Sequence, residues 1–284
     1  MLLEGNLHGI QHLGIPVTDI EHAKTWYESK LGFSTIHEPA IETKDGVIKL
    51  AFLEKDGLVL EFYQLLGDAL LEVSMRSHGH IDHFAMDVLD IRSALAEALG
   101  RDIRLDPGTP DGPVALPLWS AGVEYVFLIG SHGEKVEFNQ RLDLDPLRRS
   151  GNLGGWSHLG IPVTHIERSI DFYRQFGFEP VMQASIPVGD EEIKITMLEK
   201  DDFLLEFYQL LKTDLAEIKA RKDGHIDHFA LDVADVELAF AELKAAGYTP
   251  LEDAPVFLPF WENGVMYFNV RGPDGEKIEF NQRL

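Results

Sequence analysis

Two histidines and two glutamates recur in the same order in each half of this sequence, each inside a short apolar stretch. They are His12, Glu61, His83 and Glu137 in the first half, and His158, Glu206, His228 and Glu279 in the second. Two imidazoles and two carboxylates suit a borderline divalent ion such as Zn, Ni, Co, Mn or Fe, and the two negative charges neutralise it. A six-coordinate ion with four protein ligands keeps two positions open, which adjacent oxygens of a substrate fit. The sequence therefore predicts up to two divalent metal ions per chain.

A single His or Glu within a strand is usually a solvated or hydrogen-bonded polar residue, so one such position says little. Glutamate is depleted in strands, however. Here a Glu precedes a Phe at four matched positions, which are Glu61, Glu137, Glu206 and Glu279. A purely structural explanation has to account for all eight His and Glu positions at once, and this favours metal ligation.

The recurrence reflects an internal duplication, which is the first feature to look for in a chain of this length. The segment His12–Thr18 returns as His158–Thr164, and Leu60–Leu66 returns as Leu205–Leu211. Gly79–Ala85 likewise returns as Gly224–Ala230. We predict one repeat over residues 1–142, a linker over 143–152 rich in Pro, Gly and charge, and a second repeat over 153–284.

Each repeat is itself doubled more faintly, and each half-unit has the pattern strand, helix and three strands. In the first, strands are expected over 11–17, 34–38, 48–54 and 58–64, with a helix from Asp19 to Leu31. In the second, strands are expected over 83–88, 114–117, 124–129 and 135–140, with a helix from Asp90 to Gly100. Further helices are expected over 67–77 and 213–222.

Strand alternation sorts these residues into two faces. Leu13, Ile15 and Val17 share one face of the first strand, and His12 lies on the other. The strands that hold Glu61, His83 and Glu137 show the same division. A sheet curved around the second face forms a cup lined by His12, Glu61, His83 and Glu137, and the second repeat gives the equivalent cup. Closure of each cup between the two repeats is compatible with the same faces.

Composition narrows the class of protein. The 284 residues are 45% hydrophobic and 26% charged, as in ordinary globular domains, and cysteine is absent. The absence of cysteine excludes disulfides, thiolate catalysis and Cys-ligated zinc. The net charge of −23 disfavours nucleic acid and anionic membranes as partners. With no signal peptide over Met1–Gly9 and no long apolar run, we expect a cytoplasmic monomer or homodimer that acts on a small molecule.

These motifs resemble the vicinal oxygen chelate superfamily, which includes glyoxalase I, methylmalonyl-CoA epimerase, extradiol dioxygenases and bleomycin resistance proteins. The resemblance covers residues 7–284 and depends on the segments His12–Val17, Phe172–Phe178 and His83–Ala85 and on the two Glu-Phe strands of each repeat. It implies an α+β fold of tandem βαβββ modules, paired into two cup-shaped mixed sheets with helices outside. It also places metal ligands on the first and fourth strand of each module.

The ligand order is most similar to that of glyoxalase I, in which a metal-bound enediolate forms and a Glu transfers the proton. The resemblance implies a metal-dependent lyase or isomerase of glyoxalase or epimerase type. Glu137 and Glu279 would be the bases, and Glu61 and Glu206 would assist. Shared side chains expected near substrate are Tyr63, Trp119, Asn139, Tyr208, Trp261 and Asn281.

Two departures from glyoxalase I argue against a glutathione-derived substrate. An anchoring Arg expected four residues after the first ligand is replaced by Pro16 and by Pro162. A polar Asn expected four residues after the first Glu is replaced by Leu65 and by Leu210.

Two alternatives remain open at this stage. An Fe(II) extradiol dioxygenase needs two His and one carboxylate, which leaves three positions for substrate and O2, whereas here a fourth ligand is present. A metal-free binding or resistance protein of this fold would lack the ligand set. Metal content and oxygen uptake distinguish the three functions.

Overall fold

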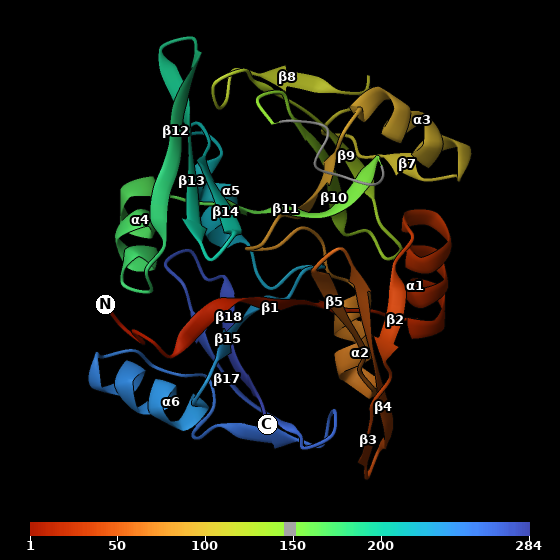
Figure 1. Cartoon of the computed structure of the whole chain (residues 1–284), viewed down its shortest axis with the longest axis vertical. Coiled ribbons are helices and arrows are strands. Elements are labelled where there is room, and N and C mark those ends of the chain that lie inside the picture. Colours follow the sequence, from red (N-terminus) through yellow and green to blue (C-terminus); the bar gives the residue numbers. More distant parts are fainter. Residues whose placement is uncertain (145–151) are drawn as a thin grey trace.

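Two curled sheets, each of nine strands, make up the computed structural model, which describes residues 1–144 and 152–284. The helices over residues 20–26, 91–100, 166–174 and 236–245 lie on the outer faces of the sheets (Figure 1). The helices are α1 (Ile20–Trp26), η1 (Tyr27–Leu31, a π-helical turn), α2 (Gly67–Ser74), α3 (Ile91–Gly100), α4 (Ile166–Arg174), α5 (Leu215–Ala220) and α6 (Val236–Ala245). This is the predicted α+β class.

The strands follow the predicted order of four modules. The first half holds β1 (Leu7–Pro16), β2 (Ser34–His37), β3 (Ala40–Thr43), β4 (Gly46–Lys55), β5 (Leu58–Gln64), β6 (His83–Val88), β7 (Arg104–Leu105), β8 (Val114–Leu116), β9 (Val123–Ile129) and β10 (Lys135–Arg141). The second half holds β11 (Leu153–Pro162), β12 (Glu179–Val188), β13 (Glu191–Lys200), β14 (Phe203–Gln209), β15 (His228–Val233), β16 (Val256–Leu258), β17 (Val265–Arg271) and β18 (Lys277–Arg283).

Each sheet combines strands from both repeats. The first has the order β16-β17-β18-β15-β1-β5-β4-β2, with β3 beside β4. The second has the order β12-β13-β14-β11-β6-β10-β9-β7, with β8 beside β9. Antiparallel pairing of β1 with β15 and of β6 with β11 joins the repeats. We call the inner faces of these sheets the first cup and the second cup.

Of the two closures that the sequence leaves open, the structure has the one between the repeats. The edge of β1 pairs with β15 of the other repeat rather than with β6, so the first module meets the fourth and the second meets the third. The chain crosses between the sheets where Ile81 and Ile226 form an antiparallel bridge. Most of the predicted linker, residues 143–152, lies outside the described residues.

Local signals in the sequence explain several element ends. The side chain of Asp19 accepts from the backbone N–H of His22 and caps α1. Gly32 ends the same segment with φ 75°, a left-handed conformation that glycine adopts without strain. The predicted helix was continuous to Leu31, but its last turn is π-helical. The short strands β3 and β7 were not predicted.

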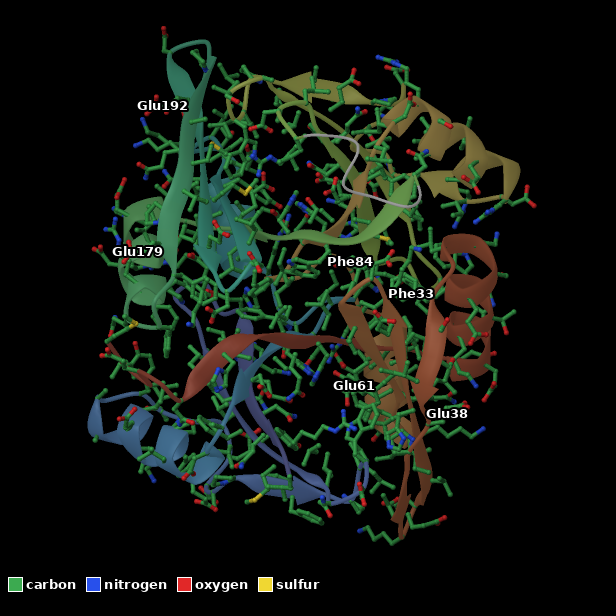
Figure 2. All side chains as sticks on the ribbon, in the orientation of Figure 1. Phe33, Glu38, Glu61, Phe84, Glu179 and Glu192 are labelled. Carbon is green, nitrogen blue, oxygen red and sulfur yellow. The ribbon has the colours of Figure 1, made fainter. Side chains whose placement is uncertain are left out.

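Alternation along the strands builds the core. Leu13, Ile15 and Phe62 are fully buried on the helix-facing side of the first sheet. Figure 2 shows Phe84 in the interior and Glu179 and Glu192 at the periphery. The opposite faces of the same strands line the cups. None of the described helices is long and apolar enough to cross a membrane.

Candidate metal centres

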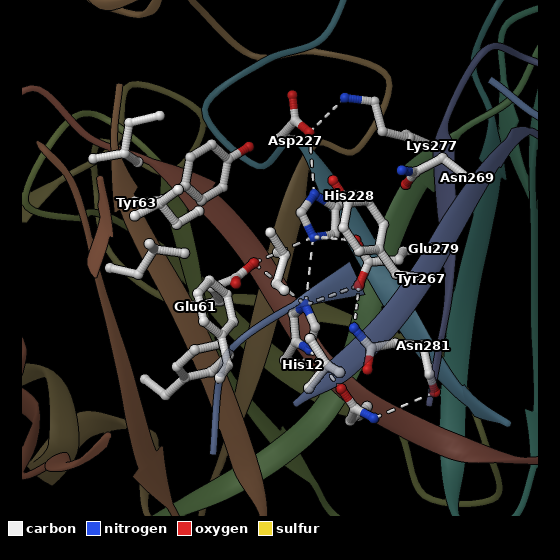
Figure 3. A pocket seen from close by; sticks show the side chains of 18 of the residues that line it. His12, Glu61, Tyr63, Asp227, His228, Tyr267, Asn269, Lys277, Glu279 and Asn281 are labelled. Carbon is white, nitrogen blue, oxygen red and sulfur yellow. Dashed lines mark hydrogen bonds and ion pairs between the residues drawn. The ribbon is translucent and has the colours of Figure 1, made fainter. Parts of the chain in front are cut away.

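The first cup brings together His12 of β1, Glu61 of β5, His228 of β15 and Glu279 of β18, on four adjacent strands at the middle of the sheet (Figure 3). His12 Nε2 lies 3.4 Å from Glu61 Oε2 and 3.6 Å from Glu279 Oε1. His228 Nε2 lies 3.4 Å from His12 Nε2, and 3.6 Å from a carboxylate oxygen of each Glu. The two glutamates flank the imidazole pair from opposite sides.

The second cup repeats this arrangement with His83, Glu137, His158 and Glu206. His83 Nε2 lies 3.2 Å from Glu137 Oε2, 3.4 Å from Glu206 Oε2 and 3.4 Å from His158 Nε2. His158 Nε2 lies 3.6 Å from an oxygen of each Glu. The predicted partners His12 and His83 thus belong to different cups, because the sheets close between repeats.

These distances fit a bound cation. Two ligands each about 2.1 Å from one ion, at tetrahedral to octahedral angles, are about 3.0–3.4 Å apart. In each cup both imidazoles and one last-strand carboxylate offer ligand atoms that lie within 4.8 Å of one another. All eight side chains are buried or nearly so, and two carboxylates in a buried site need compensating positive charge. The residues present therefore fit a divalent metal ion.

The short distances between buried His and Glu side chains shift the pKa values in the first cup. Burial raises the pKa of Glu61, but His12 and His228 outweigh it and lower the pKa to about 2. Burial lowers the pKa of His228, but Glu279, Asp227 and Glu61 outweigh it and raise the pKa to about 10. The carboxylates thus attract positive charge to this point of the cup.

In the second cup the pKa values of the two histidines shift in opposite directions. Burial lowers the pKa of His83, but Asp82, Glu206 and Glu137 outweigh it and raise the pKa to about 10. Burial lowers the pKa of His158 to about 4, so its imidazole is neutral at pH 7, the form that ligates metals. Burial raises the pKa of Glu137 to about 8, with a further contribution from Glu206.

An aspartate holds one histidine in each cup, and the sequence analysis overlooked it. Asp82 Oδ2 lies 3.2 Å from His83 Nδ1, and Asp227 Oδ2 lies 3.1 Å from His228 Nδ1. An acceptor on Nδ1 leaves Nε2 free for a metal and fixes the ring. The signal was available in the sequence, since both Gly-His-Ile-Asp-His motifs place an Asp directly before the histidine.

Basic side chains compensate these buried aspartates. Lys135 and Arg221 donate to Asp82 at 2.7 and 3.0 Å. Lys277 and Arg76 donate to Asp227 at 2.6 and 2.7 Å. Each cup therefore contains a buried His–Asp–Lys/Arg network, which orients the imidazole of His83 or of His228.

Glycine is required beside the same histidines. A Cβ on Gly14 would lie 2.0 Å from Cε1 of His228, and a Cβ on Gly160 would lie 2.0 Å from Cε1 of His83. The register places Gly14 opposite His228 and Gly160 opposite His83. The Gly of each His-Leu-Gly motif therefore makes room for a candidate metal-binding histidine of the other repeat.

A cavity opens above each set of ligands, with a volume of about 390 Å³ in the first cup and about 360 Å³ in the second. Of the six side chains predicted near substrate, five line these cavities: Tyr63, Trp261 and Asn281 in the first, and Tyr208 and Asn139 in the second. Trp119 does not line the second cavity and packs instead beside Leu118, Val123 and Ile195. Its ring is covered by Arg141, 3.6 Å away.

A family model for the glyoxalase/bleomycin resistance protein/dioxygenase superfamily matches residues 9–115 and 155–280. The chain belongs to this superfamily. The two matched segments correspond to the two repeats, so the duplication and the superfamily resemblance are both confirmed.

Several known proteins are similar to this chain in fold or in sequence. Glyoxalase I from Zea mays superposes with a TM-score of 0.69 at 18% identity, over 96% of this chain and 92% of that one. A Bacillus subtilis protein described provisionally as a dioxygenase superposes with a TM-score of 0.65 at 14% identity, over 98% of this chain and 86% of that one. The uncharacterized protein YwbC of Bacillus subtilis is 30% identical over 127 residues, which are 44% of this chain and 95% of its own. At these identities the structural matches establish the fold alone.

Proposed function

We propose that each cup binds one divalent metal ion and that the protein is a metal-dependent lyase or isomerase, of glyoxalase or epimerase type, for small oxygenated carbonyl compounds. The observation that supports this most directly is the convergence of two Nε2 atoms and two carboxylates at 3.2–3.6 Å in each cup. A bound divalent ion supplies a Lewis acid, which stabilises the negative charge that develops when a C–H next to a carbonyl loses its proton.

The chain's own carboxylates would transfer that proton. We assign the bases as Glu137 and Glu279, with Glu61 and Glu206 assisting. Asn139 Nδ2 donates to Glu137 at 2.7 Å, and Asn281 Nδ2 donates to Glu279 at 2.8 Å. A carboxylate that neutralises a cation is a poor base. The Asn amide would give the carboxylate a second hydrogen-bonding partner when the carboxylate turns from the ion toward the substrate. The raised pKa of Glu137, about 8, also suits a group that exchanges a proton near neutral pH.

Neither cavity is built for the glutathione part of a thiohemiacetal. Leu65 and Leu210 line the two cavities at the places where glyoxalase I would present a polar Asn. Pro16 and Pro162 stand where an anchoring Arg is expected. We therefore propose a substrate without glutathione, and methylglyoxal with glutathione should react far more slowly than the ~10 per second of an ordinary enzyme.

The decisive experiment compares metal content with turnover. Reconstituted protein should hold two ions per chain by elemental analysis. His12→Ala with His158→Ala should lose metal and turnover together, whereas Glu137→Gln with Glu279→Gln should keep most of the metal and lose at least about 100-fold in turnover. Solvent deuterium should enter the substrate carbon. Metal-free protein after reconstitution would refute the proposal, and iron with oxygen uptake would identify a dioxygenase instead.

A further inference from the structure

The two cups differ at one inward position directly beside the proposed base. Asn269 on β17 pairs with Glu279 in the first cup, and Phe127 on β9 pairs with Glu137 in the second. Both residues occupy the same place in their repeats, two positions after Tyr267 and Tyr125 respectively. A substrate held at either metal centre therefore meets an amide in one cup and a phenyl ring in the other.

The amide of Asn269 has a fixed orientation. Its Nδ2 donates to Glu252 Oε1 at 2.8 Å, and its backbone N–H donates to Glu252 Oε2 at 2.7 Å. Since the carboxylate accepts only, the amide nitrogen must face it. Asn269 Oδ1 is then left buried without a hydrogen-bond partner.

A second unpartnered acceptor lies in the same cup. Asn281 Nδ2 donates to Glu279, which leaves Asn281 Oδ1 buried and without a partner. Figure 3 shows both asparagines on the Glu279 side of the cavity. Only four buried side-chain atoms of the described residues lack a partner, and the other two, in His78 and Trp156, line neither cavity. A buried acceptor without a donor is unfavourable, so this wall is suited to a ligand that brings hydroxyl groups.

The wall of the second cup is apolar at the position where the first cup has Asn269. Phe127 lies 5.1 Å from the His83 ring, centroid to centroid. The remaining wall is formed mainly by aliphatic and thioether side chains: Leu116, Leu118, Ile186, Ile193, Ile195 and Met197. Such a surface gains free energy from covering hydrocarbon, and at the position of Phe127 it lacks the amide that Asn269 offers in the first cup.

We propose that the two cups take different substrate classes: a polyhydroxylated carbonyl compound in the first, and a carbonyl compound with an apolar chain in the second. This inference rests on the proposed metal-dependent function, because the metal centre holds the reacting oxygens in both cups. Asn269 and Phe127 are the residues that set the difference.

Two hydroxamates test the inference, since both chelate a metal through adjacent oxygens and differ only in their tails. Gluconohydroxamate carries hydroxyl groups, and octanohydroxamate carries an alkyl chain. Calorimetry on zinc-loaded full-length His158→Ala measures the first cup alone, and His12→Ala measures the second alone. We expect the first cup to prefer gluconohydroxamate at least about tenfold and the second to prefer octanohydroxamate by a similar factor.

Exchange of the two wall residues sharpens the test. Asn269→Phe in the His158→Ala protein should weaken gluconohydroxamate at least about tenfold, and Phe127→Asn in the His12→Ala protein should weaken octanohydroxamate, both with unchanged zinc content. The same preference in both cups, or no effect of either exchange, would overturn the inference and leave the metal centres standing. Absence of zinc or of any hydroxamate binding in both cups would overturn the proposed function together with the inference.

Discussion

The two cups have the same candidate metal ligands and different walls. The ligands come from the four central strands of each sheet, which are fixed on both edges by neighbouring strands. The wall residues Asn269 and Phe127 come from the next strand outward, and Glu252 comes from the segment before β16. Strand pairing therefore fixes the positions of the candidate metal ligands, while the outer strands vary the cavity wall around them.

The two carboxylates proposed as bases have different neighbours on the adjacent strand. Glu137 lies opposite Phe127, and burial raises its pKa to about 8. Glu279 lies opposite Asn269, whose amide is held by Glu252. One protein thus places the same carboxylate in an apolar and in a polar setting, so each cup is an internal control for the other.

The largest effect is expected from the glycines that lie against the metal-site histidines. Gly14→Ala puts a Cβ 2.0 Å from the ring of His228, so this ring must move and the first cup should lose its ion. Gly160→Ala should empty the second cup alone, by the same contact with His83. Each substitution should weaken the metal affinity of one cup by about 100-fold or more. The metal content measured by elemental analysis should then fall from two ions per chain to one.

Gly100→Ala is a matched control, because nothing lies within 4 Å of a Cβ at that position. It should keep both ions. If Gly14→Ala also kept two ions at full affinity, the packing of His228 against β1 would have no part in metal binding.

A smaller effect is expected from the aspartates behind the histidines. Asp227→Asn should weaken metal binding about 10–100-fold in the first cup, and Asp82→Asn should do the same in the second, because each removes the charge that orients an imidazole. Competition with a chelating dye, on proteins with only one cup intact, measures each affinity. Asp68→Asn, at an exposed position of α2, serves as the control. Equal affinities for Asp82→Asn and the control would show that the aspartate only packs.

The smallest effect is expected on the pH dependence of stability, in which the turn before β18 differs from the turn before β10. Glu134 accepts from Tyr27 Oη at 2.6 Å, and Glu276 accepts from Tyr173 Oη at 2.9 Å, but His132 of the first turn is replaced by Asp274 in the second. Burial, with a contribution from Asp274, raises the pKa of Glu276 to about 7. The folded state therefore favours the protonated form, and this stabilisation is complete below about pH 4.5 and is lost as pH rises through about 7.

Asp274→Asn should bring the pKa of Glu276 closer to its ordinary value. Between pH 5 and pH 8 the variant should then lose about 1 kcal/mol less unfolding free energy than the unsubstituted protein. Thermal melts at the two pH values measure this difference. Asp171→Asn on the exposed face of α4 should match the unsubstituted protein, and a matching pH dependence for Asp274→Asn would contradict the expectation.

Much of this fold follows from the sequence because strand alternation and helix ends are local. The predicted strands over 58–64 and 83–88 are β5 and β6 to the residue. The alternation of Leu60, Glu61 and Phe62 also placed the carboxylate on the cup side, since period two assigns the faces of a strand. The strand β7, which has two residues, is too short to show any period.

The partners of the ligands did not follow from the sequence. Alternation gives the face of β1 but not which strand occupies its free edge, and both β6 and β15 carry the same His-Phe-Ala motif. The first cup therefore could not be assigned its second histidine. Gly14 acts across that same edge, so its role became visible only with the pairing of β1 and β15.

The pairing of first with last module also bears on how such a protein diversifies. Two separate copies of a single repeat, joined by the same strand pairing, would form two cups of identical composition, because each would combine one module of each kind. Every substitution would then appear in both cups at once. Covalent linkage of the repeats removes this constraint, since Asn269 and Phe127 are encoded separately. One cup can therefore change its wall while the other stays as it was.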